Sequence, residues 1–203
     1  MNPAMNPITE DDIANFLVNT PDFFERHAEL LATVRLMDMM RHGTDNEVLI
    51  ERQQRWVKSL LMADSPRELP QTLVQQIERD FMVPQVALRV WDVAPEHRDE
   101  AFAQGVSEAV RDYAAALTAP YVGIQPAILP PDWLAEPDSV QSVAIIALRA
   151  TRLEDTPQSA QAQPAVGLLV LASPDPQRYH EGMGTAFLER LGDLASAALS
   201  HLR

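Results

Sequence analysis

The stretch Pro164–Leu202, PAVGLLVLASPDPQRYHEGMGTAFLERLGDLASAALSHL, decides the fold. It begins with Ala165–Ala172, a short apolar run of β-favouring residues that is typical of a strand buried in a core. A turn rich in Pro and Asp follows, and an amphipathic helix from about Gly184 to Leu202 ends the chain. Such a strand and helix need further strands and helices to pack against, and earlier residues must supply them.

Two more stretches have strand patterns. Val86, Leu88 and Val90 alternate with Ala87, Arg89 and Trp91, which predicts a strand with one face turned inward. Ser139–Arg149 predicts another strand, and the polar connection 151–163 makes it an antiparallel neighbour of Ala165–Ala172. A short strand is expected near Phe102–Val106. A helix over Ser107–Leu117 and a Pro-rich, loop-rich middle over Thr118–Asp138 follow it.

Helices dominate the first part of the chain. Thr9 and Thr20 each have the features of a helix start, and a third helix is expected from about Glu47 to Met62. Ser65-x-x-Glu68 resembles a capping box and predicts a fourth helix that ends near Asp80, with Pro70 as the alternative start.

Composition excludes several kinds of function. The formal net charge is −13, and one lysine stands among fifteen arginines, so we expect no direct binding of nucleic acid. The absence of cysteine excludes disulfides and thiolate chemistry. The N-terminus lacks a signal-peptide pattern, and the longest apolar runs are far below the roughly 20 residues of a membrane helix. These features predict a soluble cytoplasmic protein with no membrane partner.

The chain resembles the bacterial family described as domain of unknown function 484. The resemblance rests on Pro21–His27, Glu29–Leu31, Leu49–Gln53, Gly167–Pro176 and Arg178–Thr185. It implies an N-terminal helical segment, residues 1–63, followed by a GAF-like domain, residues 64–203. The implied fold class is α+β, with an antiparallel sheet, flanking helices on one side and a loop-lined cleft on the other.

Two departures from the family pattern bear on function. The family resemblance implies a long coiled coil after the Glu-Arg-Gln segment, whereas here Gln53 leads almost directly into Leu60–Ser65. A coil that fixes dimerisation or relays a signal is therefore missing. The family also favours Pro-Tyr-Cys-Gly where this chain has Pro120, Tyr121, Val122 and Gly123, which excludes a thiol role there.

Candidate ligand residues fall into two groups. A GAF-like cleft between sheet and middle loops predicts ligand contacts from Tyr121, Trp133, Trp91 and Phe102. Aromatic residues at such positions are more often part of the core, and that alternative stays open. Near the end of the last strand, Asp175 and Arg178 could recognise an anionic ligand together with His180, or they could cap the final helix and pair with each other.

The sequence lacks the signatures of common catalytic and metal sites. Gly182 and Gly184 precede a helix, but the third glycine and the acidic residue of a dinucleotide fingerprint are missing. The five histidines have no metal-ligand spacing, and no G-x-S-x-G nucleophile motif is present. We therefore expect no enzymatic activity, no metal and no cofactor.

The leading hypothesis is a non-enzymatic GAF-like sensor or regulatory module that binds an unidentified small molecule and acts as a homodimer. Apolar residues in excess of what short helices can bury suggest the dimer. They are Phe16, Phe23, Phe24, Trp56, Leu60, Leu191 and Ala195. The alternative is a protein-interaction scaffold without a small ligand. Because family members are often encoded beside a tyrosine recombinase, its partner could be chromosome-associated.

Overall fold

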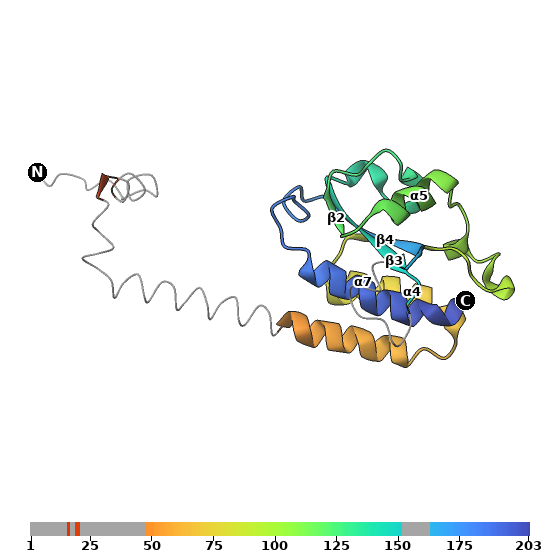
Figure 1. Cartoon of the computed structure of the whole chain (residues 1–203). Coiled ribbons are helices and arrows are strands. Elements are labelled where there is room, and N and C mark those ends of the chain that lie inside the picture. Colours follow the sequence, from red (N-terminus) through yellow and green to blue (C-terminus); the bar gives the residue numbers. More distant parts are fainter. Residues whose placement is uncertain (1–15, 17–18, 21–47, 152–162) are drawn as a thin grey trace, which may run out of the picture. The chain divides into compact units, whose positions relative to one another are not determined.

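Figure 1 shows the computed structural model of the chain, which describes residues 16, 19–20, 48–151 and 163–203. It divides into two compact units, Met1–Glu51 and Arg52–Arg203, and the second contains the whole sheet. A helix covers residues 48–61. The elements after it are η1 Pro66–Glu68, α4 Leu69–Asp80, β1 Gln85–Val90, η2 Pro95–His97, η3 Ala101–Ala103, α5 Glu108–Ala116, β2 Tyr121–Gly123, η4 Pro131–Trp133, η5 Pro137–Ser139, β3 Ser142–Arg149, β4 Ala165–Ser173, α7 Ala186–Leu199 and η6 Ser200–Leu202.

The larger unit has a four-stranded antiparallel sheet with the order β1-β4-β3-β2. Every residue of β4 is buried, which explains its nearly continuous apolar sequence. The antiparallel pairing of β3 and β4, with Ile146 opposite Leu169, confirms the strand pairing predicted from sequence. Strands β1 and β2 form the two edges, so each leaves one side of its backbone without a strand partner.

One face of the sheet packs against helices. Helices α4 and α7 and the helix at 48–61 contribute Leu73, Ile77, Leu191 and Trp56 to a core with the sheet residues of that face. Figure 1 shows α4 and α7 side by side beneath the sheet. Gly192 lets α7 approach closely, because a Cβ there would lie 2.6 Å from Cγ2 of Ile146.

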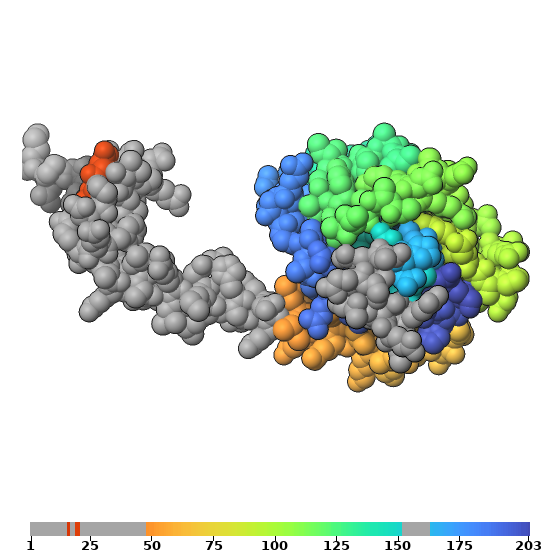
Figure 2. Space-filling model, viewed as in Figure 1, coloured from red at the N-terminus to blue at the C-terminus, as the bar shows by residue number. Residues whose placement is uncertain are grey.

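The other face of the sheet is also covered. Helix α5 and the middle loops bring Val110, Leu129, Trp133 and Leu134 against Ile145 and its neighbours. In the space-filling view these green segments form a continuous layer (Figure 2). A packed second core thus lies where the family resemblance implied a loop-lined cleft, because the loop residues are themselves large and apolar.

The predicted fold class is confirmed: the chain is α+β with an antiparallel sheet and flanking helices. The helix expected over Ser107–Leu117 is also confirmed as α5, with Ser107 as its N-cap accepting a hydrogen bond from Val110 N. The helix predicted to end near Asp80 is α4. It begins at Leu69, so Pro70 marks the start, and the Ser65 side chain makes no capping hydrogen bond.

Three strand predictions were wrong in detail. The strand expected near Phe102–Val106 is absent, and Ala101–Ala103 forms a 3-10 turn instead. Strand β1 has both faces covered, because Leu88 faces the first core and Ala87 the second. The middle region contains β2, which sequence reasoning missed because three residues ending in glycine carry no periodic signal. The helices expected from Thr9 and Thr20, and most of the connection 151–163, lie outside the described residues.

Candidate functional site

A cleft of about 770 Å³ lies along the free edge of β1. Residues Val86–Arg89 form its floor, the start of α4 forms one wall, and η3 and Trp133 form the other. The first strand, the following helical turn and the middle loops therefore meet there, although they are far apart in sequence. Its full lining is Arg67, Glu68, Pro70, Gln71, Val74, Gln75, Val86, Ala87, Leu88, Arg89, Glu100, Ala101, Phe102 and Trp133.

Arg89 is the charged group on the inner side of this cleft. Its Nη1 donates a hydrogen bond to the carbonyl oxygen of Leu88 at 2.9 Å, and its guanidinium lies 4.9 Å from the centre of the Trp133 ring. Its Nε is buried and has no hydrogen-bond partner among the residues that the structure describes. Burial lowers the pKa of Arg89 below its usual value, and the carboxylate of Asp132 offsets this only in part. The site thus contains a cation with unused hydrogen-bonding capacity.

An ion pair lies at the rim of the cleft. Nε of Arg67, beside η1, lies 2.6 Å from Oε1 of Glu100, which precedes η3. These two charges neutralise each other and link the two walls. Because the Arg67 side chain is largely exposed, the pair contributes little to stability, about 0–1 kcal/mol. Arg89, by contrast, makes no direct ion pair with any described residue, although the carboxylate of Asp132 acts on it at longer range.

The cleft brings together two of the four aromatic residues predicted to bind ligand, Phe102 and Trp133. Trp91 lies in the second core, where its Nε1 donates to the carbonyl oxygen of Ala165 at 2.9 Å. Tyr121 belongs to the opposite edge strand, and its hydroxyl donates to the carbonyl oxygen of Ile124 at 2.8 Å. For Trp91 the structure follows the core alternative.

Asp175 and Arg178 have local partners and do not line the cleft. Oδ1 of Asp175 accepts a hydrogen bond from Gln177 N at 2.8 Å and so stabilises a turn. Nη2 of Arg178 donates to the carbonyl oxygen of Phe81 at 2.9 Å, at the C-terminal end of α4. Both side chains thus serve the fold, but the predicted form of this alternative is wrong: in the described residues they neither cap the final helix α7 nor pair with each other, because Asp175 stabilises its own turn and Arg178 binds the end of α4.

Four of the residues predicted to mediate dimerisation are buried within the larger unit. Trp56, Leu60, Leu191 and Ala195 all belong to the first core. Their apolar surface is therefore covered by this chain itself. Phe16 is helical and 53% exposed. Phe23 and Phe24 lie outside the described residues, and the homodimer stays a prediction.

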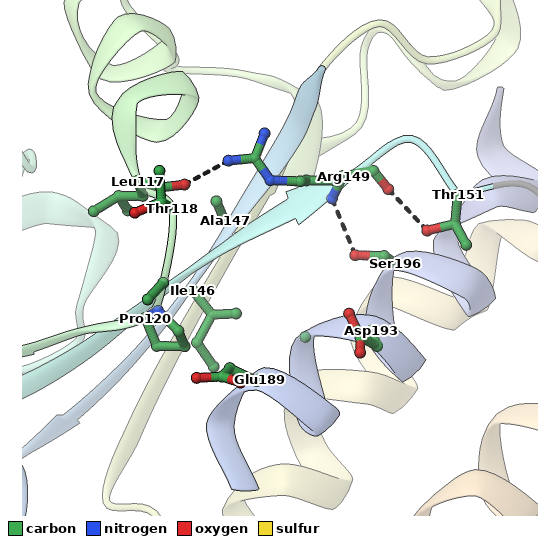
Figure 3. A pocket seen from close by; sticks show the side chains of 12 residues that line it. Leu117, Thr118, Pro120, Ile146, Ala147, Arg149, Thr151, Glu189, Asp193 and Ser196 are labelled. Carbon is green, nitrogen blue, oxygen red and sulfur yellow. Dashed lines mark hydrogen bonds between the residues drawn. The ribbon is translucent and has the colours of Figure 1, made fainter. Parts of the chain in front are cut away.

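A second, smaller cavity of about 110 Å³ lies between β3, α7 and the segment after α5 (Figure 3). Figure 3 shows Arg149 pointing toward Leu117, with Glu189 and Asp193 on α7. The Arg149 guanidinium donates to the carbonyl oxygens of Leu117 and Gln163, and its backbone N–H donates to Ser196 Oγ at 3.0 Å. The arginine of this cavity therefore already has protein partners.

Sequence reasoning missed Arg89, Arg67 and Glu100 as residues of a common site. A signal existed for Arg89, because it shares a face of β1 with Ala87 and Trp91, and both of these are buried. A charged side chain on such a buried face costs free energy unless it has an ion-pair or hydrogen-bond partner, or binds a ligand. Nothing in the sequence brings Arg67 close to Glu100, since 33 positions separate them and a fold is needed to join them.

Comparison with known proteins identifies the family. A family model described as "Protein of unknown function, DUF484" matches residues 33–201. The chain belongs to the DUF484 family. The resemblance inferred from sequence is thereby confirmed. No curated protein matches this DUF484 chain.

Among solved structures, the chain is similar to the GAF domain of a protein described as a sensor histidine kinase from Pseudomonas syringae pv. tomato. The sequence identity is 13%, and the TM-score is 0.48. The similarity covers 79% of this chain and 91% of that one.

Two further observations concern the described part of the DUF484 chain. None of its helices combines the length and apolar character needed to cross a membrane. Within the same residues, no group of three or more His, Asp or Glu side chains could hold a metal ion.

Proposed function

We propose that this DUF484 chain is a regulatory module that binds a small molecule without transforming it, in the cleft along β1. One observation carries the proposal: a half-buried arginine, Arg89, lies against Trp133 in a cleft of about 770 Å³ with an unpartnered Nε. Buried polar groups normally have partners, so an orphaned one beside a cavity suggests that a ligand completes the site.

The size and lining of the cleft suit a small organic molecule. Ligand pockets are commonly about 300–1,000 Å³ and combine apolar walls with a few polar groups. Here Val74, Phe102 and Trp133 supply apolar surface, while Arg89 and Gln75 supply hydrogen-bond donors. A scaffold without a ligand would instead be expected to fill such a space with side chains. The open cleft therefore favours the sensor over the scaffold.

The proposal includes a homodimer and a non-catalytic role. The dimer rests on apolar residues of the N-terminal segment, including Phe16, which is 53% exposed. Sedimentation equilibrium of the full chain at micromolar concentration tests it, and a monomer would remove this part while leaving the binding site intact. The non-catalytic role is supported by the charged residues of the lining: Glu100 pairs with Arg67, and Glu68 is exposed. Arg89 is therefore the charged side chain on the inner side of the cleft.

Blocking the cleft tests the binding function. Ala101 is exposed on η3 and lines the cleft, so Ala101→Trp should fill the entrance without disturbing a core. Ala115→Trp, at an exposed position of α5, is the matched control. A library of organic acids, amines and neutral aromatic compounds is screened by thermal shift, because a ligand that binds the folded state raises Tm.

We expect compounds that raise the Tm of the original chain and of Ala115→Trp, but not that of Ala101→Trp. If no compound raises the Tm of the original chain, the proposed binding function is wrong. Equal shifts in Ala101→Trp would place the binding site elsewhere.

A further inference from the structure

The free edge of β1 presents backbone donors to the cleft. The amide of Trp91 donates to the carbonyl oxygen of Val166 at 2.8 Å, in register with the β1–β4 pairing. In an antiparallel ladder the bonded direction alternates along a strand. The N–H and C=O groups of Val86 and Leu88 therefore point away from β4, and both residues line the cleft.

Arg89 changes the balance of donors and acceptors at this edge. Its Nη1 already occupies the outward carbonyl oxygen of Leu88. The N–H of Leu88 remains, together with the N–H and C=O of Val86 and the rest of the guanidinium. Among the charged groups of the rim, Arg67 and Glu100 neutralise each other, and Glu68 is exposed. The carboxylate of Asp132 acts on Arg89 from outside the cleft lining and offsets the effect of its burial only in part. The inner part of the cleft thus presents more hydrogen-bond donors than acceptors, and its lining contributes one cation there, Arg89.

From this surplus we infer that the ligand is an organic anion, whose carboxylate or phosphate group binds Arg89 and the outward N–H groups of Val86 and Leu88. Its apolar body would pack between Phe102 and Val74, which line the same cleft. This inference rests on the proposed function and specifies the ligand class of that site. An anion restores the interactions that the guanidinium loses on burial, since charge-assisted hydrogen bonds are the strong ones.

The same geometry disfavours an added peptide strand at β1. Strand addition requires outward N–H and C=O groups in alternation along the edge. The C=O of Leu88 is occupied by Arg89, so a peptide would break that contact before it could pair. A charged side chain folded over an edge is also a common device against unwanted strand pairing. A small anion needs only the donors, and no described residue accepts a hydrogen bond from the N–H groups of Val86 and Leu88.

Four probes that share one ring system test the ligand class. They are 2-naphthoate, 2-naphthyl phosphate, neutral 2-naphthamide and cationic 2-naphthylmethylammonium, and the first two compare carboxylate with phosphate. Isothermal titration calorimetry gives Kd for the full chain and for Arg89→Met and Arg89→Lys. Circular dichroism melting establishes that each variant is folded, and Arg149→Lys is the control with an altered arginine at the other cavity.

We expect 2-naphthoate or the phosphate to bind at least tenfold more tightly than the amide, with the cation weakest. Arg89→Met should abolish this preference, Arg89→Lys should retain part of it, and Arg149→Lys should leave it unchanged. If the amide binds as tightly as the anions or more tightly, and Ala101→Trp abolishes this binding, the anion class is wrong while the binding function stands. If none of the probes binds, the anion inference is wrong, and the broader library screen then decides the binding function separately.

Discussion

Arg89 and Arg149 occupy comparable positions but differ in what their guanidinium groups contact. Each lies on a strand of the sheet beside a cavity, and burial lowers the pKa of each below its usual value. Arg149 donates to two carbonyl oxygens from separate segments, those of Leu117 and Gln163. Within the described part of the chain, Arg89 donates only to Leu88, its neighbour in sequence, and keeps a buried Nε without a partner.

This difference separates a structural arginine from one available to a ligand. Arg149 connects β3 to the chain after α5 and to Gln163, two residues before β4, so its loss should weaken the fold. Among the described residues, Arg89 makes no hydrogen bond to a distant segment, its contact with Trp133 is through the ring face, and its burial is only partly compensated by Asp132. A buried charge without good partners costs free energy of folding, and functional sites are where such costs are found.

The largest expected effect comes from Gly192→Val, a position that lines the cavity of Arg149 and not the cleft of Arg89. A Cβ at this position lies 2.6 Å from Cγ2 of Ile146, so α7 must shift away from β3. Overpacking of this kind costs about 3 kcal/mol of unfolding free energy. Urea denaturation measures it, with Gly184→Ala as control because no atom lies within 4 Å of its added Cβ. An unchanged stability of Gly192→Val would contradict the close packing of α7 on the sheet.

The next effect is that of Arg149→Met, which leaves the carbonyl oxygens of Leu117 and Gln163 without their donor. Loss of charge-assisted hydrogen bonds at half-buried groups should lower the unfolding free energy by about 2 kcal/mol. Arg111→Met is the control, since Arg111 is partly exposed and contacts Trp91 and Asp92 only at the surface. A loss no greater than that of the control would mean that Arg149 is not structural.

Arg89→Met should have a smaller effect on stability, within about 1 kcal/mol in either direction. The variant loses one hydrogen bond and the contact with Trp133, but it also removes a poorly compensated buried charge. Parallel urea denaturation of the Arg89 and Arg149 variants compares them directly. If the Arg89 variant is destabilised more than the Arg149 variant, Arg89 is the structural arginine and is not kept available for a ligand.

The smallest effect concerns Asp193, beside Arg149's cavity. Burial, and then the nearby carboxylate of Glu189, raise the pKa of Asp193 above its ordinary value of 3.8. The folded state therefore holds this proton to higher pH than the unfolded state. Stability attributable to Asp193 is full below pH 3.8 and declines as pH rises through the raised pKa. Asp193→Asn should give a slightly higher Tm than the original chain at pH 7, and the difference should vanish near pH 3. A lower Tm at pH 7 would contradict this assignment.

Strong local patterns made much of the fold predictable. The apolar run of β4, the amphipathic patterns of α4 and α7 and the N-cap at Ser107 each carry their signal within a few residues. By contrast, β2 is too short to have a period, and η3 replaced an expected strand beside β1. That replacement matters for function, because a strand there would have covered the edge that now lines the cleft.

The site was less predictable than the fold. Phe102 and Trp133 were identified as aromatic residues of the region that a GAF-like fold would use, and they do share one cleft. Arg89 was read as an outward residue of an alternating strand. Its environment depends on Trp133, 44 residues later, which packs over that face of β1. A contact of this range is determined by tertiary packing, so no local pattern could reveal it.

Amide hydrogen exchange at the edge of β1 tests the central claim most directly. The NMR exchange rates of Val86 and Leu88 are measured with and without saturating 2-naphthoate, with the amides of Val143 and Ile145 in β3 as internal references. The account predicts slower exchange at Val86 and Leu88 on addition of the anion, no change in β3 and no slowing in Arg89→Met. Unchanged exchange at Val86 and Leu88 while 2-naphthoate is bound would contradict it.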